Sequence, residues 1–227
     1  MWYKSWVEVR WRLVLMTLLN AFFGAVLLDD AVSADVWRHR LSGNLPMIFA
    51  MNAIVLAGSG VASQLSQRPG QLVHPSMMFL LSLPITRSRL VLVRQAVGAM
   101  SVCALMLATT IVFCAVAPGI REIFSPASAL LFLICIAGVV FTVYAISALL
   151  STVLDQLWQT YGALAIVAGI FGAFPRARFW SILLEQFNAT NVPPTVWTQV
   201  FIGLLTCAAL TFSLVFASVR VVQRKQF

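Results

Sequence analysis

Six long stretches of the chain contain few or no charged side chains, and no other feature of the sequence constrains the fold as strongly. A helix needs about 20 mostly apolar residues to cross the hydrocarbon core of a bilayer. Hydrophobic residues make up 61% of the chain and charged residues only 10%, whereas a soluble domain carries about 25% charged residues. We therefore predict an all-α membrane protein, a single transmembrane domain over residues 1–227. Its six spans are expected at about 13–29, 45–65, 90–117, 127–150, 156–174 and 196–219.

The first apolar stretch also fits a cleaved signal peptide. Basic residues at Lys4, Arg10 and Arg12 precede it, and residues 32–34 (Val-Ser-Ala) resemble a cleavage site. The pair of aspartates at 29–30, directly after the stretch, is typical of the outer edge of a retained span. We expect the segment to be retained as the first transmembrane helix.

The positions of the basic residues predict the orientation, because short loops rich in Lys and Arg stay cytoplasmic. Six spans with both termini inside place most of the 15 basic residues on the cytoplasmic side and most of the 7 acidic residues outside. The cytoplasmic basic residues are then Lys4, Arg10, Arg12, Arg68, Arg87, Arg89, Arg94, Arg220, Arg224 and Lys225. We expect a multi-pass protein of the cell membrane.

The sequence argues against several other classes of function. The net charge of +8 comes largely from basic residues at span ends, where they contact lipid phosphates, so nucleic acid is not an expected partner. The four cysteines lie inside apolar runs, and the two histidines lie in loops on opposite predicted faces, so no metal site is expected. Ser59 lies between two glycines in the second span, but no span contains a histidine to activate it. That pattern favours close helix packing, and no catalytic residue is predicted.

The start of the chain has the pattern of an amphipathic helix. Trp2 and Trp6 share one face with Val9, whereas Arg12 falls on the opposite side. We predict that residues 1–12 form an interfacial helix, in which Trp2, Trp6, Arg10 and Arg12 hold the segment flat against the cytoplasmic leaflet. The alternative is that this segment extends the first span.

A second amphipathic stretch lies in the outer loop expected at 175–195. Phe179, Ile182, Leu183 and Phe187 recur there at helical spacing. This pattern predicts a short outer helix that is interfacial or re-entrant.

The predicted cytoplasmic loop at 66–89 contains an apolar cluster, Met77-Met78-Phe79-Leu80-Leu81, shortly before Pro84. An apolar cluster in a cytoplasmic loop indicates a binding partner. A short helix that ends before Pro84 could insert into a groove on a soluble protein. The alternative is that the cluster folds back against the bilayer surface.

Taken together, the amphipathic start, the six spans, the loop sequence Leu80-Leu81-Ser82-Leu83-Pro84-Ile85-Thr86-Arg87-Ser88-Arg89-Leu90 and the tail Gln223-Arg224-Lys225-Gln226-Phe227 resemble the type-2 permeases of ATP-binding-cassette exporters. The resemblance implies a homodimer of permeases in a bacterial inner membrane, paired with cytoplasmic ATPase subunits. It implies no cofactor in this chain, with ATP and Mg bound by the ATPase, and an outer helix that forms a lid over the pathway. The implied ATPase-coupling residues are Ser76, Met77, Met78, Phe79, Leu80, Leu83, Pro84 and Arg87.

Polar side chains inside spans are candidates for a transport pathway, because they are costly in lipid. The candidates are Asn20, Asn52, Thr109, Thr142 and Tyr144, and interhelical hydrogen bonding is the alternative role. The scarcity of charges in the spans disfavours a carrier driven by protons or sodium. The chain contains no P-loop sequence, so ATP would have to be bound by another protein. We expect a permease subunit that exports an apolar or amphipathic substrate such as a lipid, drug or peptide. A secondary carrier, a membrane scaffold and an intramembrane hydrolase are the alternatives.

Overall fold

The structure, a computed structural model, describes residues 2–27, 47–57, 86–116, 126–154, 161–166, 168–169 and 194–224. Within these ranges the chain is almost entirely helical and contains no strand, which confirms the all-α class for this part of the molecule. The long helices are α1 (Trp2–Leu27), α4 (Arg87–Val116), α6 (Pro126–Val153) and α9 (Pro194–Arg224). A shorter apolar helix spans Met47–Ala57.

Among the described residues, three helices are long and apolar enough to cross a membrane, in the segments Ser88–Val112, Leu133–Val153 and Trp197–Arg224. They correspond to the helices predicted at 90–117, 127–150 and 196–219, and these three apolar helices are confirmed. Two of them begin at a proline, Pro126 in α6 and Pro194 in α9. Proline suits the first helical position, because its missing N–H would have no intrahelical partner there.

The described residues contain fewer membrane-length helices than the six that the sequence predicts. The predicted span at 45–65 is described only at Met47–Ala57, and the one at 156–174 only at residues 161–166 and 168–169. The predicted outer loop at 175–195 lies outside the described residues, apart from the first two positions of α9.

The first helix differs from its prediction. We expected a separate interfacial helix at 1–12 followed by a span at 13–29, but α1 runs without a break from Trp2 to Leu27. No proline or glycine occurs before Gly24, so nothing in the sequence interrupts the helix between the two predicted parts. The alternative interpretation, in which the first residues continue into one longer helix, matches the continuity of α1. α1 is not among the three membrane-length helices of the described residues, so a span at 13–29 stays a prediction.

The start of α4 also differs from its prediction. The loop was expected to reach residue 89, but the helix begins at Arg87. The N–H of Leu90 donates to the carbonyl oxygen of Thr86 at 3.3 Å. Thr86 therefore occupies the N-cap position, where threonine is favoured, and Arg87 and Arg89 belong to the first turn of the helix.

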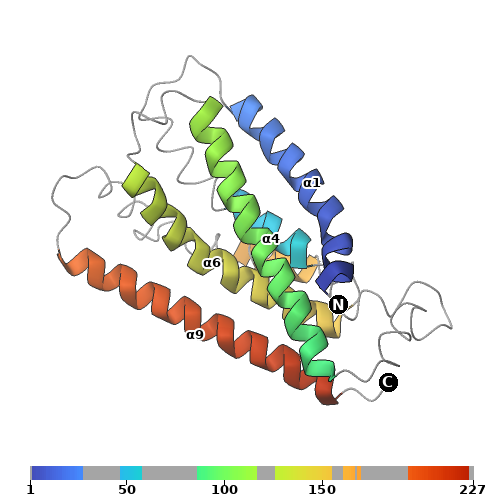
Figure 1. Cartoon of the computed structure of the whole chain (residues 1–227). Coiled ribbons are helices and arrows are strands. Elements are labelled where there is room, and N and C mark those ends of the chain that lie inside the picture. Colours follow the sequence, from blue (N-terminus) through green and yellow to red (C-terminus); the bar gives the residue numbers. More distant parts are fainter. Residues whose placement is uncertain are drawn as a thin grey trace.

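The long helices form two pairs, with α1 packed along α4 and α6 packed along α9. In Figure 1, α1 and α4 run in one direction and α6 and α9 in the opposite direction. α4 contacts both α6 and α9, and α4 and α9 converge where α4 begins and α9 ends (Figure 1). Toward the end of α4 and the start of α9, the two helices diverge.

One buried apolar core joins the first helix pair to α6. Phe49, Ile54 and Leu56 of the Met47–Ala57 helix lie in this core with Leu105 of α4 and Ile136 of α6, and all five are almost completely buried. The short helix therefore shares its core with α1, α4 and α6 and helps to fix the positions of the polar groups described below.

Candidate functional site

Three of the five predicted pathway residues meet in one buried group, the Asn–Thr cluster, which consists of Asn20, Asn52 and Thr109. Nδ2 of Asn20 on α1 donates a hydrogen bond to Oγ1 of Thr109 on α4 at 3.0 Å. Nδ2 of Asn52 donates to Oδ1 of Asn20 at 3.2 Å. The exposed fractions of Asn20, Asn52 and Thr109 are 3%, 4% and 4%. The cluster thus connects three helices at one point inside the apolar core.

The central residue of the cluster is Asn20, because it uses its amide nitrogen and its amide oxygen on two different helices. Leaving a buried polar group without a partner costs about 1–3 kcal/mol. These hydrogen bonds therefore favour one arrangement of the three helices over arrangements that would separate the groups. Interhelical bonding, the alternative role in the sequence analysis, describes these three residues; a pathway role for them stays a prediction.

Arg12 makes a second connection between α1 and the Met47–Ala57 helix. Its Nη1 donates to the carbonyl oxygen of Val55 at 3.3 Å. Arg12 was predicted as an anchor to the membrane surface, whereas its guanidinium group lies against a neighbouring helix. Together with the Asn–Thr cluster, this contact makes α1, the short helix and α4 one connected unit.

Thr142, another predicted pathway residue, lies in the contact between α6 and α9. The hydroxyl groups of Thr142 and Thr211 lie 3.3 Å apart and share a hydrogen bond. The Thr142 hydroxyl also donates to the carbonyl oxygen of Gly138 at 2.9 Å and approaches that of Cys207 at 3.4 Å. α9 packs closely here, because a methyl group at Gly138 would lie 3.1 Å from Cδ2 of Leu204.

Tyr144, the fifth predicted pathway residue, crosses from α6 to α4. Its hydroxyl group donates to the carbonyl oxygen of Gln95 at 3.2 Å, and the side chain is only 6% exposed. The ring lies against Gly98, where an added Cβ would approach the Tyr144 hydroxyl most closely and Cζ to 2.8 Å. The contact therefore requires a glycine at 98.

Gln95 and Gly98 were not among the site residues predicted from the sequence. An isolated glycine within an apolar helical run is a known indication of close approach by another chain segment. That signal was present at Gly98, but it does not identify the approaching residue, which lies 46 positions later in the chain.

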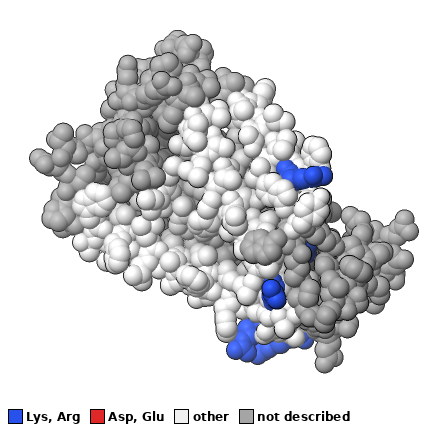
Figure 2. All heavy atoms as spheres, in the orientation of Figure 1, with Lys and Arg blue, Asp and Glu red and all other residues white. Residues whose placement is uncertain are grey.

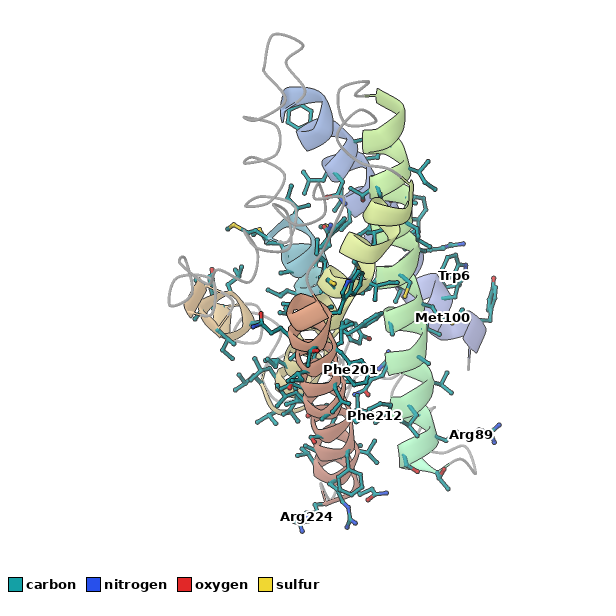
Figure 3. All side chains as sticks on the ribbon, turned by 90° about the vertical axis from the view of Figure 1, so that its left-hand side faces the viewer. Trp6, Arg89, Met100, Phe201, Phe212 and Arg224 are labelled. Carbon is teal, nitrogen blue, oxygen red and sulfur yellow. The ribbon has the colours of Figure 1, made fainter. Side chains whose placement is uncertain are left out.

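Basic side chains mark one end of the helix bundle. Arg89 at the start of α4 and Arg224 at the end of α9 lie at the same end of the molecule (Figure 3). Arg220 stacks over the ring of Phe216 at 5.0 Å, one turn before Arg224. Figure 2 shows basic atoms in separate groups toward the lower and right side, with no acidic atom visible among the described residues of this face. From Gln95 to Val116 in α4, and throughout α6, the sequence contains no charged residue.

The outward side of α9 is apolar and exposed. Phe201, Phe212 and Phe216 have exposed fractions of 65%, 77% and 60%, and the first two are labelled along α9 in Figure 3. In water such a surface would be unfavourable at about 25 cal/mol per Å². An apolar environment or a protein partner is therefore the expected surrounding of this face.

An apolar groove of about 370 Å³ lies between the start of α1 and the middle of α4. Trp6 and Met100 approach each other at its edge (Figure 3). The hydroxyl group of Ser101 bonds within its own helix, to the carbonyl oxygen of Val97 at 2.8 Å. The lining residues are Tyr3, Trp6, Val97, Met100, Ser101 and Ala104.

The remaining predicted site residues are placed as follows. Trp2 is the first residue of α1, and the exposed guanidinium group of Arg10 lies 5.7 Å from the ring of Trp11. Arg87 is the first residue of α4. The coupling residues from Ser76 to Pro84 lie outside the described part of the chain. In the described residues, no group of three or more His, Cys, Asp or Glu side chains could hold a metal ion.

Searches of protein-family models, curated proteins and solved structures found no match to this chain.

Proposed function

We propose that the chain is the membrane-spanning permease subunit of an ATP-driven exporter. In this proposal it crosses the membrane six times and moves an apolar or amphipathic substrate by alternating access. A separate cytoplasmic protein hydrolyses the ATP. The observation that carries the proposal is the position of two arginines. Because α4 and α9 run in opposite directions, Arg89 at the start of α4 and Arg224 at the end of α9 lie at the same end of the molecule.

The shared basic end supports a cytoplasmic position for the start of α4 and the end of α9, because positively charged span ends stay inside. The helix directions support the same topology. Six alternating spans require the first and third to run outward and the fourth and sixth inward. α1 and α4 share one direction, and α6 and α9 share the other, as this alternation requires.

The composition of the helices supports an energy source outside this chain. α4, α6 and α9 contain no Asp or Glu, so they offer no carboxylate for a proton or sodium relay. The predicted pathway residues in these helices bond to neighbouring helices instead. The resemblance of the loop at 66–89 to a coupling segment, which rests on sequence alone, supports an ATPase as the missing component.

The exposed apolar side of α9 supports membrane lipid or a second copy of the permease as the neighbour of this helix. An α6 of 28 residues would be about 42 Å long, which exceeds the roughly 30 Å hydrocarbon core even when the helix is tilted. In the exporter, two permease copies would enclose the pathway, each contacting one ATPase subunit.

Affinity purification of the tagged full-length chain from its native membrane tests the proposal. We expect an ATPase with Walker motifs to co-purify. Phe79→Asp combined with Leu83→Asp should reduce its recovery about 10-fold or more, because charges would enter an apolar contact. Gln67→Asp combined with Gln71→Asp adds the same two charges to the same loop outside the coupling segment and should retain the ATPase. Recovery of the wild-type chain without any ATPase, together with proton-dependent uptake in liposomes, would identify a secondary carrier instead.

A further inference from the structure

We propose that Tyr144 is a positioning residue that forms a switchable contact between two helix units of the permease. The first unit consists of α1, the Met47–Ala57 helix and α4, and the second consists of α6 and α9. This proposal rests on the proposed function, because it takes from it the alternation between two arrangements. It deepens that function by naming the contact at which the two units move against each other.

Hydrogen bonds hold each unit together internally. In the first unit, Asn20 bonds to both Asn52 and Thr109. In the second, Thr142 bonds to Thr211. Each unit is therefore expected to move as one body, with changes concentrated at the surface between the units.

Tyr144 crosses that surface. Its hydroxyl group on α6 donates to the carbonyl oxygen of Gln95 on α4 at 3.2 Å. That carbonyl lies within α4, where it can also accept the helical hydrogen bond from the residue four positions later. Losing the Tyr144 bond therefore does not leave the carbonyl unsatisfied, so the contact can open at a modest cost.

Gln95 also offers a second acceptor. Its side-chain oxygen Oε1 is buried and accepts no hydrogen bond within the described structure. A buried acceptor of this kind favours an arrangement in which it gains a donor. We assign the Tyr144 hydroxyl as that donor in the second arrangement. Gln95 then offers Tyr144 its backbone carbonyl oxygen in one arrangement and its side-chain oxygen in the other.

Gly98 provides the space for this exchange. The Tyr144 ring lies directly against Gly98, with Cε2 at 3.1 Å from the position of an added Cβ. Without a side chain at 98, the ring can slide along α4 between the two acceptors. Any larger residue would separate the units at this point.

The contact between Tyr144 and Gln95 lies in the half of α4 that is nearer its basic end. Beyond this contact, α4 and α9 diverge (Figure 1). From Gln95 to Val116, α4 extends about 31 Å at 1.5 Å per residue. A rotation of about 10° at Tyr144 would therefore move the far end of α4 by about 5 Å. A small exchange of hydrogen-bond partners is enough to change the spacing between the distant helix ends.

Spin-label distance measurements on the full-length chain in lipid nanodiscs test the inference. With the four native cysteines replaced by alanine, labels at Ile111→Cys on α4 and Phe201→Cys on α9 report the spacing between the units, and both positions are exposed. Labels at Ile134→Cys and Phe201→Cys report the spacing within the second unit. We expect two populated distances between the units and one distance within the second unit.

The decisive variant is Tyr144→Phe, which keeps the ring and removes only the hydroxyl. The ratio of the two inter-unit populations should shift by about 2- to 10-fold toward the arrangement described here. In that arrangement the Gln95 carbonyl keeps its helical hydrogen bond without the hydroxyl, whereas in the second arrangement Oε1 of Gln95 loses its donor. Thr142→Val is the matched control, because it removes a hydrogen bond of the same helix within one unit. It should leave the inter-unit ratio unchanged.

An unchanged inter-unit ratio in Tyr144→Phe, or an equal change in Thr142→Val, overturns the inference. Because the measurement uses the permease chain without its ATPase, such a result would leave the exporter proposal standing. Conversely, two inter-unit distances that depend on Tyr144, together with a purification in which no ATPase is recovered with the chain, would support the switch and reject the exporter.

Discussion

Nδ2 of Asn20 on α1 lies 3.0 Å from Oγ1 of Thr109 on α4, and the two residues are 89 positions apart in the sequence. Asn20 also accepts a hydrogen bond from Asn52, so this one side chain connects three helices. In an apolar interior the connection is specific, because each partner loses its hydrogen bond if the helices shift apart.

Asn20→Ala should destabilise the protein by about 1–3 kcal/mol, because it removes two hydrogen bonds and leaves Asn52 and Thr109 with unsatisfied groups. Unfolding of the purified chain by SDS in mixed micelles, followed by circular dichroism, measures the change. Thr206→Ala is the control, because the Thr206 hydroxyl is exposed and bonds to the carbonyl oxygen of Ile202 in its own helix. An Asn20→Ala protein that is no less stable than Thr206→Ala would show that the cluster does not hold the helices together.

Gly98→Ala should destabilise the chain by about 1–3 kcal/mol, because the added methyl group overlaps the Tyr144 ring and forces the helices apart. Gly169→Ala provides the comparison, since an added Cβ at Gly169 meets no atom within 4 Å. That substitution should be neutral or slightly stabilising, by up to about 1 kcal/mol. Thermal unfolding in detergent measures both effects.

Tyr144→Ala should cost less stability in the Gly98→Ala background than in the wild-type chain, because there it also removes the ring that the new methyl group overlaps. A double-mutant cycle measures this coupling. Strictly additive effects would mean that the residues do not interact as described.

The sequence predicted the long apolar helices because their signal is local. In α4, α6 and α9 an extended uncharged run determines the helix by itself, and Thr86, Pro126 and Pro194 mark where it begins. The predicted break in α1 was wrong because a helical wheel shows which residues share a face but contains no information about a bend. Val9 belongs to the apolar face that was predicted to lie against the membrane surface, but it is buried in the apolar core between the helices.

The contacts of the candidate site could be predicted only in part. Burial in an apolar helix made Asn20, Asn52, Thr109, Thr142 and Tyr144 candidates for hydrogen bonding. The pairing of Asn20 with Thr109, or of Tyr144 with Gln95, depends on how helices far apart in sequence cross each other. No local pattern encodes that geometry.

The two basic helix ends should react with reagents from the same side of the membrane. In a cysteine-free chain, Arg89→Cys and Arg224→Cys should both be labelled by a membrane-impermeant maleimide in inverted vesicles and protected in intact cells. Phe212→Cys, on the exposed apolar side of α9, should resist labelling in both, because the proposed topology places this side in an apolar environment, where a thiol ionises poorly and reacts slowly with maleimides. Labelling of positions 89 and 224 from opposite sides would refute the proposed topology.

The central claim is that this chain is the membrane part of a machine whose ATPase is a different protein. Native mass spectrometry of the complex released from membranes tests it most directly, because it measures the mass and composition of one intact particle. We predict a particle that contains two copies of the 24.9 kDa chain and two copies of a nucleotide-binding protein. A particle made of this chain alone, under conditions that preserve other membrane complexes, would contradict the account.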